Sequence, residues 1–125
     1  MTENDISYKI RGAIYSVYND LGPGLLESAY EAMLAFELKK SGLKLKTQVP
    51  LPLFRDEVRL DVGYRIDIIV ESKVIIEIKS VETLADVHHK QVLTYLKISG
   101  LKLGILVNFN TSDINNSIYR KVNGL

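Results

Sequence analysis

Residues 65–80 have the sequence RIDIIVESKVIIEIKS, two runs rich in β-branched residues separated by a short polar segment. Isoleucine and valine fit the pleated surface of a strand, and Glu71-Ser72-Lys73 has the length of a hairpin loop. The pattern predicts two antiparallel strands, over residues 58–70 and 74–80. Gly63, inside the first of them, indicates a bend or a bulge.

Charged side chains recur on one face of this predicted hairpin. Successive side chains on a strand point to opposite faces, so residues two apart share a face. If Val70 lies opposite Val74, then Asp67 lies opposite Glu77, with their Cβ atoms roughly 5 Å apart. Lys79 follows on the same face, and the other face of both strands is apolar. We therefore expect two carboxylates and a lysine on one side of the hairpin and a helix packed against the other.

Such an arrangement suits the hydrolysis of a phosphodiester. Two carboxylates that face each other repel unless a cation lies between them, and Mg²⁺ typically takes one or two carboxylates together with waters and phosphate. A lysine beside such a site can orient a metal-bound water or help to deprotonate it. The competing interpretation is ordinary charge alternation on the solvent face of a hairpin, which the pattern by itself leaves open.

Three helices are predicted from apolar residues at helical spacing, over residues 5–20, 25–40 and 84–99. Gly22-Pro23-Gly24 separates the first two, because proline and glycine end one helix and precede the next. Gly100 is expected to close the third helix as a C-cap.

Two further strands are predicted. Residues 45–54 are extended, but Pro50 and Pro52 confine them to a sheet edge or a broken strand. Residues 103–109, Leu-Gly-Ile-Leu-Val-Asn-Phe, predict a buried strand parallel to a neighbour. The tail from Thr111 is compatible with a short helix or a strand. The predicted order is α-α-β-β-β-α-β, with a right-handed helical crossover into the last strand.

Two polar motifs lie on the predicted helices. Gly24, Glu27 and Tyr30 stand at the start of the second helix, where a glutamate complements the helix dipole and a tyrosine can join the core. Gln91 and Tyr95 are four residues apart on the third helix and share a face that apolar residues flank. They are either partly buried polar groups that need partners or ordinary exposed residues.

The carboxylates and lysine of the hairpin, taken with these two motifs, resemble the PD-(D/E)XK nuclease superfamily. More specifically, the chain is similar to the small prokaryotic branch named for the motif GxxExxY, matched by Gly24, Glu27 and Tyr30. The resemblance extends from the first helix to the strand ending at Phe109. It implies an α/β (α+β mixed sheet) fold with a restriction-endonuclease-like α-β-β-β-α-β core and an extra N-terminal helix. Ile66 stands where the superfamily's name has proline, at a position that varies within the superfamily.

The resemblance implies a Mg²⁺-dependent phosphodiesterase, with Mn²⁺ as an alternative metal. Asp67, Glu77 and the backbone carbonyl of Ile78 would bind the metal. Glu27 would approach from its helix as a direct, water-mediated or second-metal ligand. Lys79 would position the attacking water and stabilise charge in the transition state.

Gln91, Tyr95 and Tyr30 would, by the same resemblance, support the site or contact the substrate. The implied partner is nucleic acid, DNA in preference to RNA, while strandedness and endo or exo mode stay open. The main rival to an active nuclease is a catalytically silent relative that binds nucleic acid or a protein partner. A purely structural domain is the third reading.

Length and composition limit the number of domains and the cellular compartments that fit the chain. A chain of 125 residues predicts one domain, over residues 1–125. The absence of cysteine excludes disulfides and thiolate metal sites, and no apolar run approaches the roughly 20 residues of a membrane helix. We therefore expect a cytoplasmic protein without a membrane partner. A net charge of +1 favours no partner class, and a homodimer is an open option for so small a domain.

Two other groups of side chains have less specific roles. His88 and His89 are adjacent on a predicted helix and point roughly 100° apart, so they cannot readily chelate one metal together. His88 faces either the site or the surface. The lysines near the end of the second helix form a solvated charge run or contact phosphates; they are Lys39, Lys40, Lys44 and Lys46.

Overall fold

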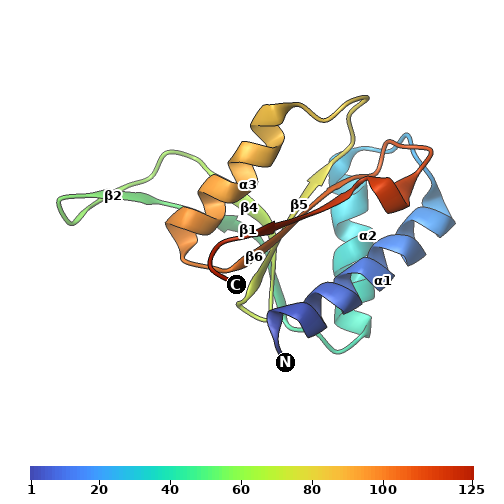
Figure 1. Ribbon diagram of the computed structural model, residues 1–125, viewed down its shortest axis with the longest axis horizontal. Coiled ribbons are helices and arrows are strands. Elements are labelled where there is room, and N and C mark those ends of the chain that lie inside the picture. The colour runs from blue at the N-terminus through green and yellow to red at the C-terminus, as the bar shows by residue number, and fades with distance from the viewer.

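The computed structural model describes residues 1–125, three helices around a mixed five-stranded sheet, an α+β fold (Figure 1). The helices are α1 (Glu3–Leu21), α2 (Glu27–Lys40) and α3 (Asp86–Ser99). The main sheet consists of β1 (Leu45–Pro50), β4 (Arg65–Val70), β5 (Val74–Lys79), β6 (Leu103–Asn108) and β7 (Ile118–Val122). A separate hairpin consists of β2 (Leu53–Arg55) and β3 (Val58–Leu60).

The elements α2, β1, β4, β5, α3 and β6 form the predicted α-β-β-β-α-β core, and α1 is the extra N-terminal helix. The strand order in the sheet is β1-β4-β5-β6-β7. β5 and β6 are parallel, as the buried run in β6 predicts, and α3 connects them. The tail forms a short 3-10 helix, η1 (Ile114–Asn116), and then β7, which pairs antiparallel with β6.

Local capping chemistry sets the helix ends, which lie within two residues of the predicted ones. At the start of α1, Thr2 and Asp5 form a reciprocal capping box, each side chain accepting from the other's backbone N–H at 3.1 and 3.0 Å. Gly22 follows α1 with a φ of 66°, and Gly100 ends α3 in the left-handed region with a φ of 76°. These are conformations that glycine adopts without strain.

The prediction of one continuous strand over residues 58–70 is wrong, whereas residues 45–54 form the broken strand that their two prolines allow. Both are interrupted, at residues 51–52 and 61–64, and the pieces beyond the breaks leave the sheet to pair as β2 and β3. Pro52 cannot donate a ladder hydrogen bond, and Gly63 turns the chain with a φ of 83°. The broken-strand option for residues 45–54 and the bend at Gly63 are thus confirmed. β1 also lies at a sheet edge, as its proline requires.

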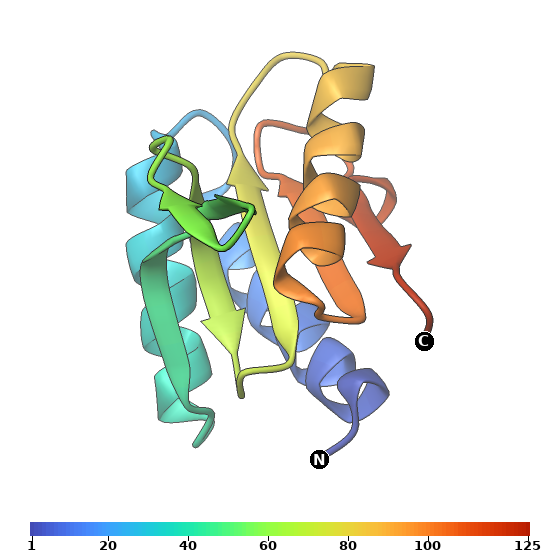
Figure 2. The same ribbon diagram turned by 90° about the vertical axis from the view of Figure 1, so that its left-hand side faces the viewer.

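Helices cover both faces of the sheet (Figure 2). α1 and α2 pack on one face over the larger core, to which β4 and β5 contribute their apolar side, as predicted: Ile68, Val70, Val74, Ile76 and Ile78. α3 and the β2–β3 hairpin lie on the other face, where Tyr95 and Leu96 join Ile75 in a second, smaller core. None of the three helices is both long enough and apolar enough to cross a membrane.

Candidate active site

The predicted register of β4 and β5 is confirmed, because Val70 pairs with Val74. The backbone ladder between these strands ends at Ile68 and Ile76, where β4 and β5 begin to part. Beyond that point β4 stays paired with β1 and β5 with β6. The parting leaves a gap between two strands in the middle of the sheet, and the next residues along are Asp67 and Glu77.

The two carboxylates fill this gap by taking over the hydrogen bonds of the ladder. The backbone N–H of Asp67 donates to Glu77 Oε2 at 3.0 Å, and the backbone N–H of Ile78 donates to Asp67 Oδ2 at 2.8 Å. Each carboxylate is therefore fixed by the backbone of the opposite strand. This is more than the cross-strand proximity that the register predicts, because the two side chains are also oriented.

Glu77 is buried, with 3% of its surface exposed, so the solvent-face interpretation of the alternating charges is wrong for this residue. Burial and then the negative charge of Asp67 raise the pKa of Glu77 to about 9, and the nearby Lys79 offsets only a small part of this increase. Without a bound cation, Glu77 is consequently protonated at neutral pH.

Oxygen atoms that could bind a hard cation are free on both side chains. Glu77 Oε1 accepts no hydrogen bond, and Asp67 Oδ1 has only a long contact of 3.4 Å from Gln48 Nε2. Ile78 directs its N–H towards β4, and in an extended strand the carbonyl of the same residue points to the same side. The donor set fits a divalent cation with oxygen ligands. It comprises two acidic side chains, and no group of three histidine or acidic side chains lies close enough to hold a metal.

Glu27 lies near the site but contacts a different part of it. As the first residue of α2, it reaches the end of β5, where its Oε2 accepts from the backbone N–H of Ser80 at 3.1 Å. The Ser80 hydroxyl in turn donates to the carbonyl of Leu25 at 2.6 Å. The start of α2 is thereby tied to the strand that carries Glu77 and Lys79. The structure does not bring Glu27 into one cluster with Asp67 and Glu77.

Tyr30 supports the loop before Glu27 from inside the protein. Its side chain is fully buried, and its ring stacks on Phe109 with centroids 4.3 Å apart. Its hydroxyl donates to the carbonyl of Gly22 at 2.5 Å and accepts from the N–H of Leu25 at 3.2 Å. These bonds hold the turn around Gly24, whose φ of 102° favours glycine. Tyr30 and Gly24 of the motif thus fix the turn that leads into α2, and with it the position of Glu27 at the first residue of the helix.

The two residues of the motif predicted on the third helix, Gln91 and Tyr95 of α3, have different environments. Tyr95 is buried, and its burial together with the nearby charges of Glu77 and Asp67 raises the pKa of its hydroxyl to about 12. Its ring lies 6.0 Å from that of Tyr64. Gln91 is half-buried one turn earlier, and its side chain forms no hydrogen bond within the chain. Tyr95 thus takes the buried one of the two alternatives that the spacing leaves open, whereas the side-chain amide of Gln91 is available to a ligand.

Two residues of the site, Gln48 and Glu31, escape prediction from the sequence. Gln48 stands opposite Asp67 on β1, between the pairs Thr47–Ile68 and Val49–Ile66, and has a φ of 51°. Its Nε2 donates to Glu31 Oε1 at 2.6 Å and approaches Asp67 Oδ1 at 3.4 Å. Burial raises the pKa of Glu31, the hydrogen bond from Gln48 lowers it, and the charge of Asp67 raises it.

A weak signal for Glu31 exists, because it follows Glu27 by four residues and so shares a face of α2. Gln48 has no such signal. Glutamine rarely adopts a positive φ, and nothing in the local sequence predicts one in a strand. A non-glycine residue in this conformation next to the carboxylates is the kind of backbone outlier that gathers at functional sites.

Asn108, at the end of β6, is a further buried polar residue that supports the site. Its Oδ1 accepts from the N–H of Val81 at 3.1 Å, and its Nδ2 donates to the carbonyl of Val81 at 2.9 Å. These two bonds fix the chain just beyond Lys79 and Ser80. Its signal in the sequence is a single amide at the end of an otherwise apolar run.

The two histidines contact parts of the chain other than the carboxylate pair, and the lysines at the end of α2 are exposed. His88 Nδ1 accepts from the N–H of Ala85 at 3.1 Å and so caps the start of α3. The ring of His89 packs edge-on against Tyr119 with centroids 4.8 Å apart. The exposed lysines at the end of α2, Lys39 and Lys40, form no ion pair.

The three helices and the mixed five-stranded sheet form an α+β fold that is consistent with a restriction-endonuclease-like domain. The chain belongs to the PD-(D/E)XK nuclease superfamily, whose family model matches residues 4–121. No curated protein and no solved structure matches the chain. Membership indicates nuclease activity, nucleic-acid binding and the use of divalent metal ions.

Proposed function

We propose that this protein hydrolyses phosphodiester bonds of DNA, in preference to RNA, in a Mg²⁺-dependent reaction that Mn²⁺ also supports. The observation that carries the proposal is the interlocked pair of Asp67 and Glu77, each held by the backbone of the other's strand. Orientation of both carboxylates before any ligand arrives is what a metal-dependent phosphodiesterase requires.

Asp67 Oδ1, Glu77 Oε1 and the carbonyl of Ile78 would hold the metal. Glu27 would complete the site through a water or a second ion, since it is anchored to Ser80 rather than to the acidic pair. When bound, the metal would polarise the phosphate and lower the pKa of an attacking water. Glu77 would bind it as a carboxylate, because a cation there would offset the burial and the charge of Asp67 that raise the pKa of Glu77.

Lys79 would act on the reacting phosphate. It follows Glu77 by two residues on the same face of β5, and its charge already acts on the Glu77 carboxyl. An ammonium group there can position the attacking water and stabilise the charge that develops on phosphate oxygens. Gln91 would contact the substrate through its free amide, while Tyr95 and Tyr30 would support the site from the core.

Three finer assignments accompany this proposal. The match of Gly24, Glu27 and Tyr30, with the loop geometry that Tyr30 imposes, supports the GxxExxY branch of the superfamily. The absence of cysteine supports a cytoplasmic location. Residues 1–125 would act as one domain, because α1 and α2 share a core with the strands β4, β5 and β6.

A catalytically silent module that binds nucleic acid or a protein is the second candidate function. The observation that favours it is the absence of a third acidic side chain close enough to Asp67 and Glu77 to share a metal. In this case the buried pair would be a remnant of the superfamily's site. Such a protein would bind its partner with equal affinity in the presence and absence of Mg²⁺.

One experiment separates the two functions. Labelled single-stranded, duplex and branched DNA, and the matching RNAs, are incubated with Mg²⁺ or Mn²⁺ and the wild-type chain, Asp67→Asn or Asp20→Asn. Asp20 is an exposed acid on α1 that forms no hydrogen bond, so its variant is the matched control. We expect metal-dependent cleavage by the wild type and the control, and a loss of about 100-fold or more in Asp67→Asn. Binding of a substrate in a gel-shift assay, equal with and without Mg²⁺ and without cleavage of any substrate, would favour the silent module.

A further inference from the structure

The β2–β3 hairpin exposes an edge strand with an apolar side. It projects from the body of the molecule (Figure 1), and three large apolar side chains, Val58, Leu60 and Val62, are 57%, 43% and 49% exposed. No backbone group of residues 58–62 forms a hydrogen bond outside the hairpin. An open groove of about 630 Å³ separates Leu60 from Ile98 of α3, so the body of the protein does not cover this side either.

The edges of the main sheet are protected, in contrast to this one. β1 carries Pro50 and the distorted Gln48, and β7 carries Arg120 and Lys121. Proline, irregular backbone and positive charge are the devices that keep sheet edges from pairing with other chains. The strand β3 has one such device, the charged Arg59, and its other two side chains, Val58 and Leu60, are apolar. A hairpin of two three-residue strands is also marginally stable by itself, so pairing would stabilise it.

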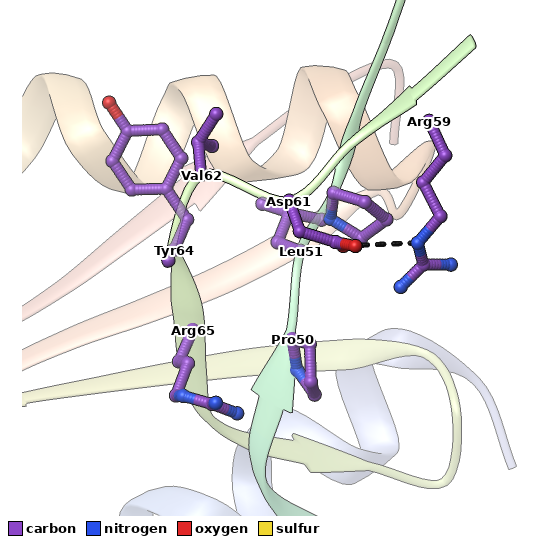
Figure 3. Close-up of a pocket in the computed structure, with 9 residues that line it drawn as sticks. Pro50, Leu51, Arg59, Asp61, Val62, Tyr64 and Arg65 are labelled. Carbon is purple, nitrogen blue, oxygen red and sulfur yellow. Dashed lines mark hydrogen bonds and ion pairs between the residues drawn. The ribbon is translucent and has the colours of Figure 1, made fainter.

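Residues 58–62, Val-Arg-Leu-Asp-Val, are complementary to a second copy of themselves. If two copies run antiparallel with Leu60 opposite Leu60, then Arg59 lies opposite Asp61 of the second copy and Val58 lies opposite its Val62. Arg59 and Asp61 already share one side of the chain, because they form an ion pair at 3.0 Å. Figure 3 shows this pair at the base of the hairpin, with Val62 pointing away from it.

We propose that the chain forms a two-fold homodimer through antiparallel pairing of β3 with β3 of a second copy. The result is a four-stranded intermolecular sheet. Its apolar side gathers Val58, Leu60 and Val62 of both copies, and its other side carries four alternating charges. This is an isologous contact, in which one surface recognises itself, and the occupant of the edge is therefore a second copy.

The proposal is independent of the nuclease activity, since none of these residues belongs to the carboxylate site. A stable interface buries about 800 Å² on each partner, and the five residues from β3 to Val62 offer less. We therefore expect a reversible dimer that is populated at protein concentrations of about 100 µM and dissociates on dilution.

Charge exchange tests the register directly by sedimentation velocity. Arg59→Asp places acids at both positions and Asp61→Arg places arginines at both, so each variant alone meets like charges and should stay monomeric. Mixed in equal amounts, the two variants face opposite charges at every position and should form a heterodimer. Phe36→Lys, which alters an apolar residue of similar exposure on α2, should dimerise as the wild type does.

A second measurement does not depend on charge. The chain has no cysteine, so Leu60→Cys introduces the only thiol. Two such thiols would lie about 5 Å apart across the two-fold axis, whereas those of Val58→Cys would be about 14 Å apart along the strands. A short thiol cross-linker should join the first variant and leave the second monomeric. A wild type that remains monomeric at 100 µM, a mixture that fails to associate, or equal cross-linking at both positions would overturn the proposal.

Discussion

The carboxyl group of Glu77 is harder to ionise in the folded protein than in the unfolded chain. Burial and the charge of Asp67 raise its pKa to about 9 from an ordinary 4.5, so the unfolded chain releases its proton at a lower pH than the folded chain. Between these two values the unfolded state binds fewer protons, and stability falls as the pH rises. Below about 4.5 the carboxyl is protonated in both states and contributes nothing to this dependence.

Glu77→Gln should therefore stabilise the metal-free protein at pH 8 and leave it unchanged at pH 4. Glutamine can still accept from the N–H of Asp67, but it cannot be ionised in the unfolded state. We expect the melting temperature in EDTA to rise by about 5 °C or more at pH 8. Thermal unfolding followed by circular dichroism at both pH values measures this. Equal shifts at pH 4 and pH 8 would show that Glu77 is not protonated in the fold.

Gln48 combines a backbone conformation that glutamine disfavours with an amide that holds Glu31 and approaches Asp67. Gln48→Gly and Gln48→Ala both remove the amide, but only glycine relieves the positive φ. We expect the glycine variant to be the more stable of the two by about 1 kcal/mol in urea unfolding. Both should lose cleavage activity to the same extent, mainly in kcat. Unequal losses of activity would mean that the backbone, rather than the amide, positions Asp67.

At the scale of elements, the turn that precedes α2 depends on one hydroxyl. Tyr30→Phe keeps the ring stacked on Phe109 but removes the bonds to Gly22 and Leu25. Loss of these bonds should lower the free energy of unfolding by about 1–3 kcal/mol. Cleavage should decrease by less than in Asp67→Asn, because Glu27 keeps its bond to Ser80. An unchanged stability together with a raised KM would instead indicate that Tyr30 contacts the substrate.

Elements whose signals are local could be predicted from the sequence, and those whose signals are not local could not. The helix ends follow from glycine and from capping side chains within a few residues, and the pairing of Val70 with Val74 follows from a short loop. β2 and β3 pair with each other because β1 alone pairs with the outer edge of β4. Which segment pairs with β4 depends on contacts between residues far apart in the sequence. Two prolines and one glycine indicate a break, but they do not say where the released segments pair.

At the scale of the whole molecule, the same contrast applies to the site. Strand alternation places Asp67 opposite Glu77 from the sequence alone, because both residues lie on one hairpin. Glu31 and Gln48 come from α2 and β1, and their approach to Asp67 depends on how these elements pack and on one unusual φ. Neither the packing of these elements nor the positive φ of Gln48 can be predicted from the periodicity of the sequence. Long-range packing thus completes a site of which the hairpin supplies the acidic pair.

The central claim is that Asp67 and Glu77 hold the metal while Lys79 acts on the phosphate. Mn²⁺ binding by calorimetry and single-turnover cleavage of labelled DNA, measured on the same samples, test it most directly. Asp67→Asn should lose both metal binding and cleavage. Lys79→Ala should bind Mn²⁺ as the wild type does and cleave about 100-fold or more slowly. Wild-type cleavage by Asp67→Asn, or loss of metal binding in Lys79→Ala alone, would contradict the assignment.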